Sequence, residues 1–477
     1  MGTKDKVHDH IISAKGAMSM FTAYELHEKI GELLEKKDLK ALQELFRHEN
    51  PIDIAGALDG FPEKEVTIGF RLLSKEQAAQ VFVEMDSETQ EVLLASFNDR
   101  ELGEIVDELS LDDAADLVEE MPANVVSRIL KNTDAETRRL INEILLYPQD
   151  SAGSIMTPEY VSLRRDMSVE EAFEKIRMEG VDKETIYTCY VTENRTLVGI
   201  VSVKNLLLSD RAARVGDIMT ADFIAVKTTD DKEFAASQIK KYGFLALPVL
   251  DTEDRLVGIV TIDDAMDVIE SEATEDIEQM AAILPSEKPY LKTGVLRIWL
   301  SRIPWLLLLM VSATFTSKII SSYETALAAC AVLTAFIPMI MDTGGNAGGQ
   351  ASVTVIRGLS LGEIGLRDVL RVIWKELRVS LLCGASLAPV VFLKVMFIDG
   401  LYTEPDGVIV SIVVAATLLF VVVLAKLIGC LLPLLAKAVH LDPAVVANPF
   451  ITTIVDALAL IVYFALASHY IPALMGG

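Results

Sequence analysis

Residues 444–474 have the sequence AVVANPFITTIVDALALIVYFALASHYIPAL, an apolar run long enough to cross a lipid bilayer as one helix. The run contains a carboxylate, Asp456, whose insertion at mid-membrane costs roughly 2.5–3.5 kcal/mol, so such a residue normally faces a partner or a water-filled path. Helical spacing puts Asn448, Thr452 and Asp456 on one face. Because hard cations bind oxygen, this stripe predicts a cation path, the alternative being a carboxylate satisfied by a neighbouring helix.

The charge of the chain is divided unevenly between its two parts. Of the 43 basic and 69 acidic residues, 11 and 10 lie in residues 296–477, so residues 1–295 carry essentially the whole net charge of −26. A field of this sign disfavours nucleic acid as a partner and attracts cations. The four cysteines include no CxxC pair, so neither a disulfide framework nor a zinc site is expected.

Five segments of the C-terminal part are long enough to span a membrane, at residues 298–320, 325–356, 376–397, 408–435 and 446–471. The second segment is interrupted by Pro338 and by the stretch 343–346, which reads TGGN. Basic residues gather before the first span, between the second and third, and between the fourth and fifth. The positive-inside rule therefore predicts a multi-pass protein of the bacterial inner membrane, with its N-terminus in the cytoplasm and its C-terminus outside.

The N-terminal part has two sections with different patterns. Residues 24–147 have apolar residues at helical spacing between breakers such as Pro51, Pro62 and Pro122. This pattern predicts short helices, either a stack of repeated hairpins or an irregular bundle. In the next section, residues 155–161 (IMTPEYV) are echoed by 218–224 (IMTADFI), and 197–202 (LVGIVS) by 256–261 (LVGIVT).

The second section resembles a tandem pair of CBS domains over both repeats. Each repeat has a helix, then a strand and a turn, then the Gly-Ile-Val strand and a further helix. The resemblance implies a regulatory module that is able to bind an adenine nucleotide such as ATP, although the sequence assigns no residues to such a site. A long acidic helix follows, from Asp264 to Leu284. Carboxylates at helical spacing repel one another unless something neutralises them, which favours a face that binds cations. The alternative is a charged face that is simply solvated.

The second span contains the phrase PMIMDTGGNAGGQ, residues 338–350, and the last span contains Asn448-Pro449 followed by Asp456. Glycines let helices approach closely, and a broken helix exposes carbonyls where it lines a cavity. These motifs, with the order of parts, resemble the MgtE family of magnesium channels and transporters over essentially the whole chain. The expected fold is an all-α N-domain (1–150), tandem α/β CBS domains (151–264), an acidic connecting helix, here the plug helix (265–295), and a five-helix transmembrane domain (296–477).

Several expectations follow from this resemblance rather than from spacing. It implies a homodimer with one pore, in which Asp456 binds Mg²⁺ while Asn448 and Thr452 line the same wall. Gly344, Gly345 and Asn346 are expected to shape the path. Mg²⁺ bound between the soluble domains and the plug helix is expected to close the channel. The regulatory ligands implied are Asp112, Asp116, Asp231, Glu233, Asp264, Asp267, Glu272, Glu275, Asp276 and Asp442.

Other functions fit the sequence less well. A transporter for Mn²⁺ or Co²⁺ stays open, since an oxygen stripe favours a hard ion without fixing which one. A membrane-anchored CBS sensor that transports nothing would need neither Asp456 nor the glycine-rich span. An enzyme is not expected, because the chain has no nucleophile–base pair, phosphate loop or metal-hydrolase spacing, and its six histidines are scattered.

Overall fold

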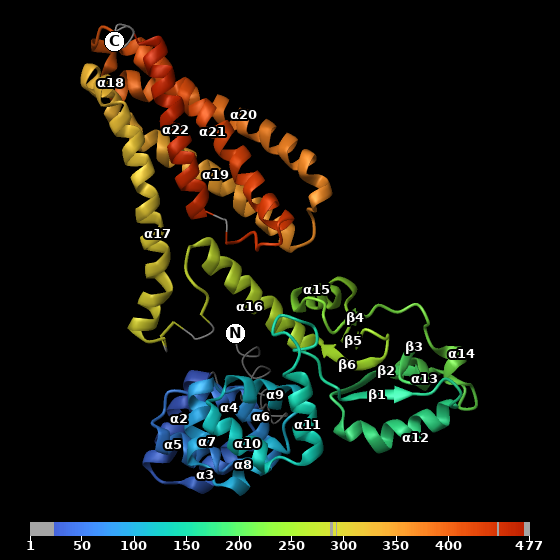
Figure 1. Ribbon diagram of the computed structural model, residues 1–477. Helices are drawn as coiled ribbons and strands as arrows, with labels where there is room; N and C mark the ends of the chain where they lie inside the picture. The colour runs from blue at the N-terminus through green and yellow to red at the C-terminus, as the bar shows by residue number, and fades with distance from the viewer. Residues whose placement is uncertain (1–22, 287–289, 292, 446–447, 472–477) are drawn as a thin grey trace, which may run out of the picture. The chain divides into compact units, whose positions relative to one another are not determined.

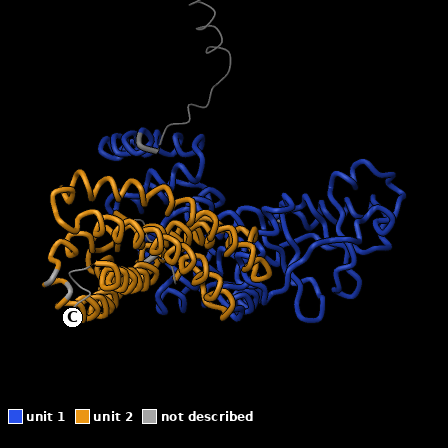
Figure 2. The backbone as a smooth tube through the Cα atoms, turned by 90° about the horizontal axis from the view of Figure 1, so that it is seen from above, with its two compact units in different colours: residues 1–268 blue, residues 269–477 orange. Residues whose placement is uncertain are grey.

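The computed structural model describes residues 23–286, 290–291, 293–445 and 448–471 (Figure 1). The chain divides into two compact units, residues 1–268 and 269–477 (Figure 2). The first unit contains the N-terminal helices and the CBS repeats, and the second contains the long apolar helices.

The first unit begins with a regular series of short helices. Their bounds are α2 Ala23–Glu35, α3 Leu39–Phe46, α4 Pro51–Leu58, α5 Glu63–Phe70, α6 Lys75–Val83, α7 Ser87–Ser96, α8 Asp99–Val106, α9 Leu111–Glu120, α10 Ala123–Asn132 and α11 Ala135–Ile144. Alternate helices contact each other, such as α2 with α4, α4 with α6 and α6 with α8, around one apolar core. The all-helical N-domain is therefore confirmed.

The helix starts of this series recur at a fixed interval. The N-caps of α3 to α11 are residues 38, 50, 62, 74, 86, 98, 110, 122 and 134, so each N-cap lies 12 residues after the preceding one. Asp, Asn or Ser at seven of them accepts a hydrogen bond from a backbone N–H of the first turn, and Pro occupies the other two. This regularity favours the stack of hairpins over the irregular bundle.

Two small α/β units of the same topology follow. The first contains β1 Tyr160–Leu163, α12 Val169–Glu179, β2 Thr185–Glu193, β3 Thr196–Ser202 and α13 Val203–Leu208, and the second α14 Val215–Ile218, β4 Val226–Lys227, α15 Lys232–Tyr242, β5 Ala246–Leu250 and β6 Leu256–Thr261. In each three-stranded sheet the first two strands are parallel and the last two antiparallel. The sheets match the tandem repeat predicted from the sequence.

The echoed motifs join the two repeats, because each repeat's Ile-Met-Thr segment bonds to a strand of the other repeat. The backbone N–H of Thr157 donates to the carbonyl of Ile259 at 2.8 Å, and that of Thr220 donates to Ile200 at 2.8 Å. A Cβ on Gly258 would lie 2.7 Å from the sulfur of Met156, which is why the Gly-Ile-Val strand needs glycine there. Each Ile-Met-Thr segment thus packs on the other repeat's strand, so the repeats form one module.

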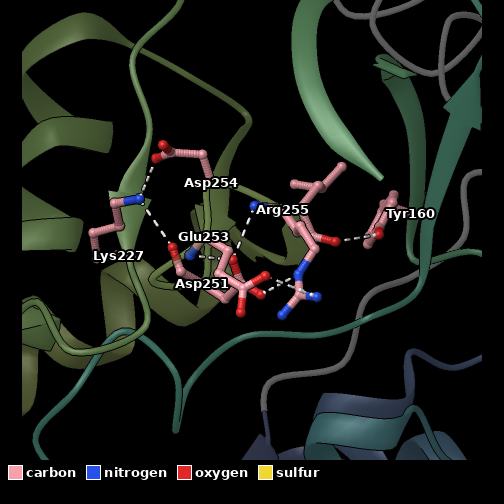
Figure 3. A network of polar contacts seen from close by, with 7 residues as sticks. Tyr160, Lys227, Asp251, Glu253, Asp254 and Arg255 are labelled. Atoms are coloured by element: carbon pink, nitrogen blue, oxygen red, sulfur yellow. Dashed lines mark hydrogen bonds and ion pairs between the residues drawn. The ribbon is translucent and has the colours of Figure 1, made fainter. Parts of the chain in front are cut away.

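The turn between β5 and β6 is fixed by a polar network around Asp251 (Figure 3). The Asp251 carboxylate accepts hydrogen bonds from the Arg255 backbone N–H at 2.9 Å and from Arg255 Nε at 2.7 Å, while Lys227 Nζ donates to the Asp251 carbonyl at 2.9 Å. The Tyr160 hydroxyl donates to the Leu256 carbonyl at 3.1 Å. This network connects β1 of the first repeat to the second repeat.

The acidic helix is α16, Ile262–Met280, and the long helices that follow it are α17 Val295–Ser322, α19 Ile337–Ser360, α20 Val369–Leu393, α21 Gly407–Ala438 and α22 Asn448–Tyr470, with a short α18 Glu324–Ala329. Among the described residues, four helical segments are long and apolar enough to cross a membrane, at 295–322, 366–398, 407–438 and 449–470. The fifth long helix, α19, packs against α21 and α22. Several long apolar helices therefore form a membrane domain, as expected.

The second predicted span differs from the expectation in one respect. The chain is irregular at Cys330 and 3₁₀-helical at Ala331–Phe336, and Pro338 lies in the first turn of α19. The stretch 343–346 is predicted to interrupt the helix, but α19 runs through it without a break. The reason is packing, because these glycines let α21 and α22 approach the helix closely enough to stabilise it.

Candidate cation path and acidic regulatory surfaces

The contact between α19 and α22 depends on glycine. A Cβ on Gly344 would lie 2.7 Å from Val421 on α21 and 2.9 Å from Val455 on α22, and one on Gly345 would lie 3.1 Å from Thr452. Both glycines are buried, so no larger residue fits without moving a helix. The two glycines predicted to shape the path therefore set the spacing of α19 from its neighbours.

The polar residues predicted for the path lie on the same two helices. Asp456 and Thr452 are half-buried on α22, and Asn346 is exposed on α19. The Thr452 hydroxyl donates to the carbonyl of Pro449 at 3.0 Å, which leaves its oxygen lone pairs for a further partner. Asn448 is the first residue of α22, and its side chain lies outside the described part of the structure.

Asp342 was not among the predicted site residues, yet it lies within electrostatic reach of Asp456. The sequence held a signal for it, because Asp342 is one helical turn before Asn346 in the quoted motif. In the described residues neither carboxylate forms an ion pair.

The first acidic surface lies between α9 and the start of α16, both in the first unit. Asp112 is 9% exposed, and its Oδ1 is buried without a hydrogen-bond partner. Crowding by protein atoms and the charge of Asp112 raise the pKa of both Asp116 and Asp264 to about 7. The Asp264 carboxylate also accepts a hydrogen bond from Thr261. Three of the predicted regulatory residues are therefore brought together.

Sequence reasoning missed other members of this surface. Glu184, just before β2, has its pKa raised to about 7 by burial and by the charges of Asp112 and Asp263. Burial and the charge of Asp267 raise the pKa of Glu84, the C-cap residue of α6. No local pattern marks Glu84 or Glu184, because each is one of many charged residues in its stretch of sequence. The acids that surround each of them in space come from distant parts of the chain.

Other predicted regulatory residues have separate surroundings. Asp231 is the N-cap of α15, and its carboxylate accepts hydrogen bonds from the backbone N–H groups of Glu233 at 2.8 Å and Phe234 at 3.3 Å. Glu233 lies in the first turn of α15, and Glu272 is half-buried on α16. The described contacts of Asp231 are those of a helix cap.

The second acidic surface lies in the second unit, around the C-terminal half of α16. Burial raises the pKa of Asp276, and the charges of Asp442 and Glu275 raise it further, against a lowering hydrogen bond from the Ser360 hydroxyl at 3.1 Å. Ser360 is the last residue of α19. Glu275, Asp276 and Asp442 are thus brought together at the end of a membrane-domain helix.

No three His, Cys, Asp or Glu side chains within the described ranges lie close enough to hold one metal ion between them. Mg²⁺ gives up its waters reluctantly and usually keeps several of them in protein sites. A Mg²⁺ ion held partly through water needs fewer protein ligands than a closed cage of protein ligands does.

Comparison with known protein families matches three regions of the chain. The family model of the MgtE intracellular N domain matches residues 49–150, that of the CBS domain matches 152–210 and 215–271, and that of MgtE, divalent cation transporter, matches 337–466. An intracellular helical domain, two CBS repeats and this membrane domain define a multi-pass transporter of divalent cations, not an enzyme.

Two similar proteins of known function narrow this class of transporter to magnesium. The chain is 36% identical over 441 residues to the magnesium transporter MgtE of Thermus thermophilus, covering 91% of this chain and 96% of that protein. It is 31% identical to the magnesium transporter MgtE of Bacillus subtilis, covering 94% and 98%. The chain therefore belongs to the MgtE family of magnesium transporters, and the resemblance seen in the sequence is confirmed.

Two solved structures are similar to about half of the chain. A crystal structure of the cytosolic domain of the Mg²⁺ channel MgtE in complex with ATP has 36% sequence identity and a TM-score of 0.49, covering 51% of this chain and 99% of that one. The soluble part of a magnesium transporter has 30% identity and the same TM-score, covering 53% and 99%.

Proposed function

We propose that the chain is a Mg²⁺-selective channel or transporter of the bacterial inner membrane, with its N-terminus in the cytoplasm and its C-terminus outside. Asp456 is the centre of the ion path, which Thr452 and Asn448 line, while Gly344, Gly345 and Asn346 shape it. The observation that carries the proposal is Asp456 itself, a carboxylate on a membrane helix that has no ion pair among the described residues.

A homodimer completes this path. One Asp456 offers a single carboxylate, whereas two copies about a two-fold axis offer two to one hydrated ion. Contacts through water suffice and leave the ion free to move on, because full dehydration needs more oxygen ligands than this stripe has. Selection then depends on the size of the hydrated ion. Cobalt hexammine, which mimics a hydrated ion, is expected to block the wild type but not Asp456→Asn.

Cytosolic Mg²⁺ closes the gate by neutralising the acidic surfaces. At low Mg²⁺ the bare carboxylates around Asp112, Asp116 and Asp264 repel one another, and so do Glu275, Asp276 and Asp442. Asp267 and Glu272 add charge on α16, and Asp231 and Glu233 add charge at the start of α15. Moving a gate from 1:99 to 99:1 requires about 5.5 kcal/mol of preference for the closed state. Several weak sites acting together supply it, and weak sites match the millimolar level to be sensed.

Adenine nucleotide is a proposed regulatory ligand of the CBS pair, as the family resemblance implies. Calorimetric titration of the purified full chain with ATP, at fixed Mg²⁺, tests this. Saturable heat with one nucleotide per chain supports binding, and heat no greater than dilution contradicts it.

Growth of a magnesium-uptake-deficient bacterium at limiting Mg²⁺ tests the main proposal. The chain is compared with Asp456→Ala at equal expression in the membrane. Rescue by the wild type alone supports Mg²⁺ entry through a path that needs Asp456. Rescue by both removes Asp456 from the centre of the path. Rescue by neither moves the assignment to another divalent ion, such as Mn²⁺ or Co²⁺, or to a sensor that transports nothing.

A further inference from the structure

Helix α19 has two faces of opposite character. The glycines Gly344, Gly345 and Gly348 lie buried against α21 and α22. On the other side Asp342, Asn346 and Gln350 follow one another at four-residue steps, and all three are exposed. A polar stripe on a membrane-domain helix does not face lipid, because hydrocarbon satisfies none of its groups. The stripe therefore faces water or another polar surface.

The glycine contacts fix the register of α19 against α22. A Cβ on Gly348 would meet Ile451, one on Gly345 would meet Thr452, and one on Gly344 would meet Val455. Each step back along α19 thus corresponds to a step forward along α22, so the two helices run antiparallel.

Continuing this register places Asp342 level with Asp456, one turn beyond the Gly345–Thr452 contact. The electrostatic interaction between the two carboxylates agrees with this placement. Asp342 therefore lies at the same depth of the membrane domain as the residue at the centre of the proposed path.

Two like charges at one depth are unfavourable unless a cation balances them. Neither Asp342 nor Asp456 has a basic partner among the residues that the structure describes. Elsewhere in the second unit, acids near basic residues do pair, as Asp399 does with Lys394 at 2.7 Å and Asp368 with Arg371 at 3.0 Å. Because no basic residue among those described balances Asp342 and Asp456, the counter-charge can be a transiently bound cation.

We infer that Asp342 is a second carboxylate of the ion path, where it and Asp456 together hold a hydrated divalent cation. This inference rests on the proposed transport function and adds a residue to its site. Asp342 acts at the polar stripe that continues through Asn346 and Gln350, so the ion passes along α19 as well as along α22.

The test is Mg²⁺ uptake by liposomes containing the full-length chain and a Mg²⁺-sensitive dye, measured as initial rate against external Mg²⁺. Wild type is compared with Asp342→Asn, which keeps the size and removes the charge, and with Asp342→Glu, which keeps the charge. Glu404→Gln is the control, because Glu404 is an exposed acid in the loop before α21. Should Asp342→Asn fail to reach the membrane, Asp342→Ser gives the same comparison.

We expect Asp342→Asn to raise the half-saturating Mg²⁺ concentration about tenfold. This factor corresponds to the loss of the attraction between a doubly charged ion and one carboxylate about 6 Å away across water. Asp342→Glu and Glu404→Gln stay close to wild type. A half-saturating concentration for Asp342→Asn equal to that of Glu404→Gln would overturn the inference and leave the transport function standing. Absence of uptake by the wild type would instead overturn the transport function.

Discussion

The cytosolic and membrane halves of this chain use the same chemical group in opposite ways. In the first unit, carboxylates from α6, α9, α16 and the first CBS repeat crowd together, and their pKa values are raised. In the second unit the proposed path relies on Asp342 and Asp456, two carboxylates on glycine-packed helices. We expect the crowded carboxylates to need cations for stability, and the pair in the membrane domain to leave a bound cation free to move. Under the proposed function, the number of neighbouring acids would separate sensing from conduction.

The largest expected effect is on gating. Replacing Glu275 and Asp276 together by Gln and Asn removes the charges that Mg²⁺ is proposed to neutralise near Asp442, so the channel should stay open. The cytosolic Mg²⁺ concentration that halves the flux should rise roughly tenfold or more, as measured by flux into liposomes at varied internal Mg²⁺. Glu63→Gln with Glu65→Gln, on α5, removes equal charge as a control. Unchanged inhibition in the first pair would break the comparison.

The next effect concerns pH. Asp116, Glu184 and Asp264 have a pKa of about 7 when folded, whereas Asp and Glu in an unfolded chain have a pKa near about 4. Between these values the folded chain binds more protons, so its stability should fall as the pH rises from about 4 to 7.

Mg²⁺ should reverse this loss, since it replaces the missing protons. Melting of the full chain in detergent at about pH 5.5 and about pH 8, with and without millimolar Mg²⁺, measures both trends. Equal melting temperatures at the two pH values without Mg²⁺ would show that the carboxylates are not crowded.

A third effect contrasts the packing of the halves. A Cβ on Gly429 of α21 would overlap the Gly348 backbone of α19, whereas a Cβ on Gly56 of α4 meets no atom within 4 Å. Gly429→Ala should therefore cost about 1–3 kcal/mol, and Gly56→Ala should stabilise by up to about 1 kcal/mol. Thermal unfolding of the two variants measures these changes. A loss of stability in both variants would show that the two glycines do not differ in packing as described.

The smallest effect tests the regular caps of the N-domain. The Asn98 side chain accepts hydrogen bonds from the backbone N–H groups of Arg100 and Glu101 at 3.0 Å, and the Asn98 N–H donates to the Glu101 carboxylate at 3.0 Å. Asn98→Ala should destabilise the domain by about 1 kcal/mol, while Asn142→Ala, on an exposed helix face, should cost nothing. Equal stability of the two variants in denaturant unfolding would remove the caps from the account.

The fold was predictable where sequence pattern and structure share a cause. The Ile-Met-Thr and Gly-Ile-Val echoes predicted the CBS pair because Met156 requires the space that Gly258 leaves. The 12-residue cap interval was readable too, but the apolar positions alone did not reveal it. The glycines of α19 were misread as a helix break, because only their contacts with α21 and α22 explain why the helix persists.

The candidate site was predictable only in part. Asp456 stood out because a carboxylate in an apolar run is costly. Glu184 carried no such signal, since its importance comes from Asp112 on a distant helix. Asp342 lay in the quoted motif but was not chosen, because its relation to Asp456 depends on the register between α19 and α22. Tertiary contacts of this kind are not encoded in local spacing.

The most direct test of the central claim is Mg²⁺ flux into liposomes that contain wild type or Asp456→Asn, at low and high Mg²⁺ on the cytosolic face. We expect wild-type flux to be large at low Mg²⁺ and small at high Mg²⁺, and Asp456→Asn to give no flux at either. If Asp456→Asn instead conducts as fast as the wild type and closes at the same Mg²⁺ concentration, conduction does not need the Asp456 carboxylate and the proposed path is wrong.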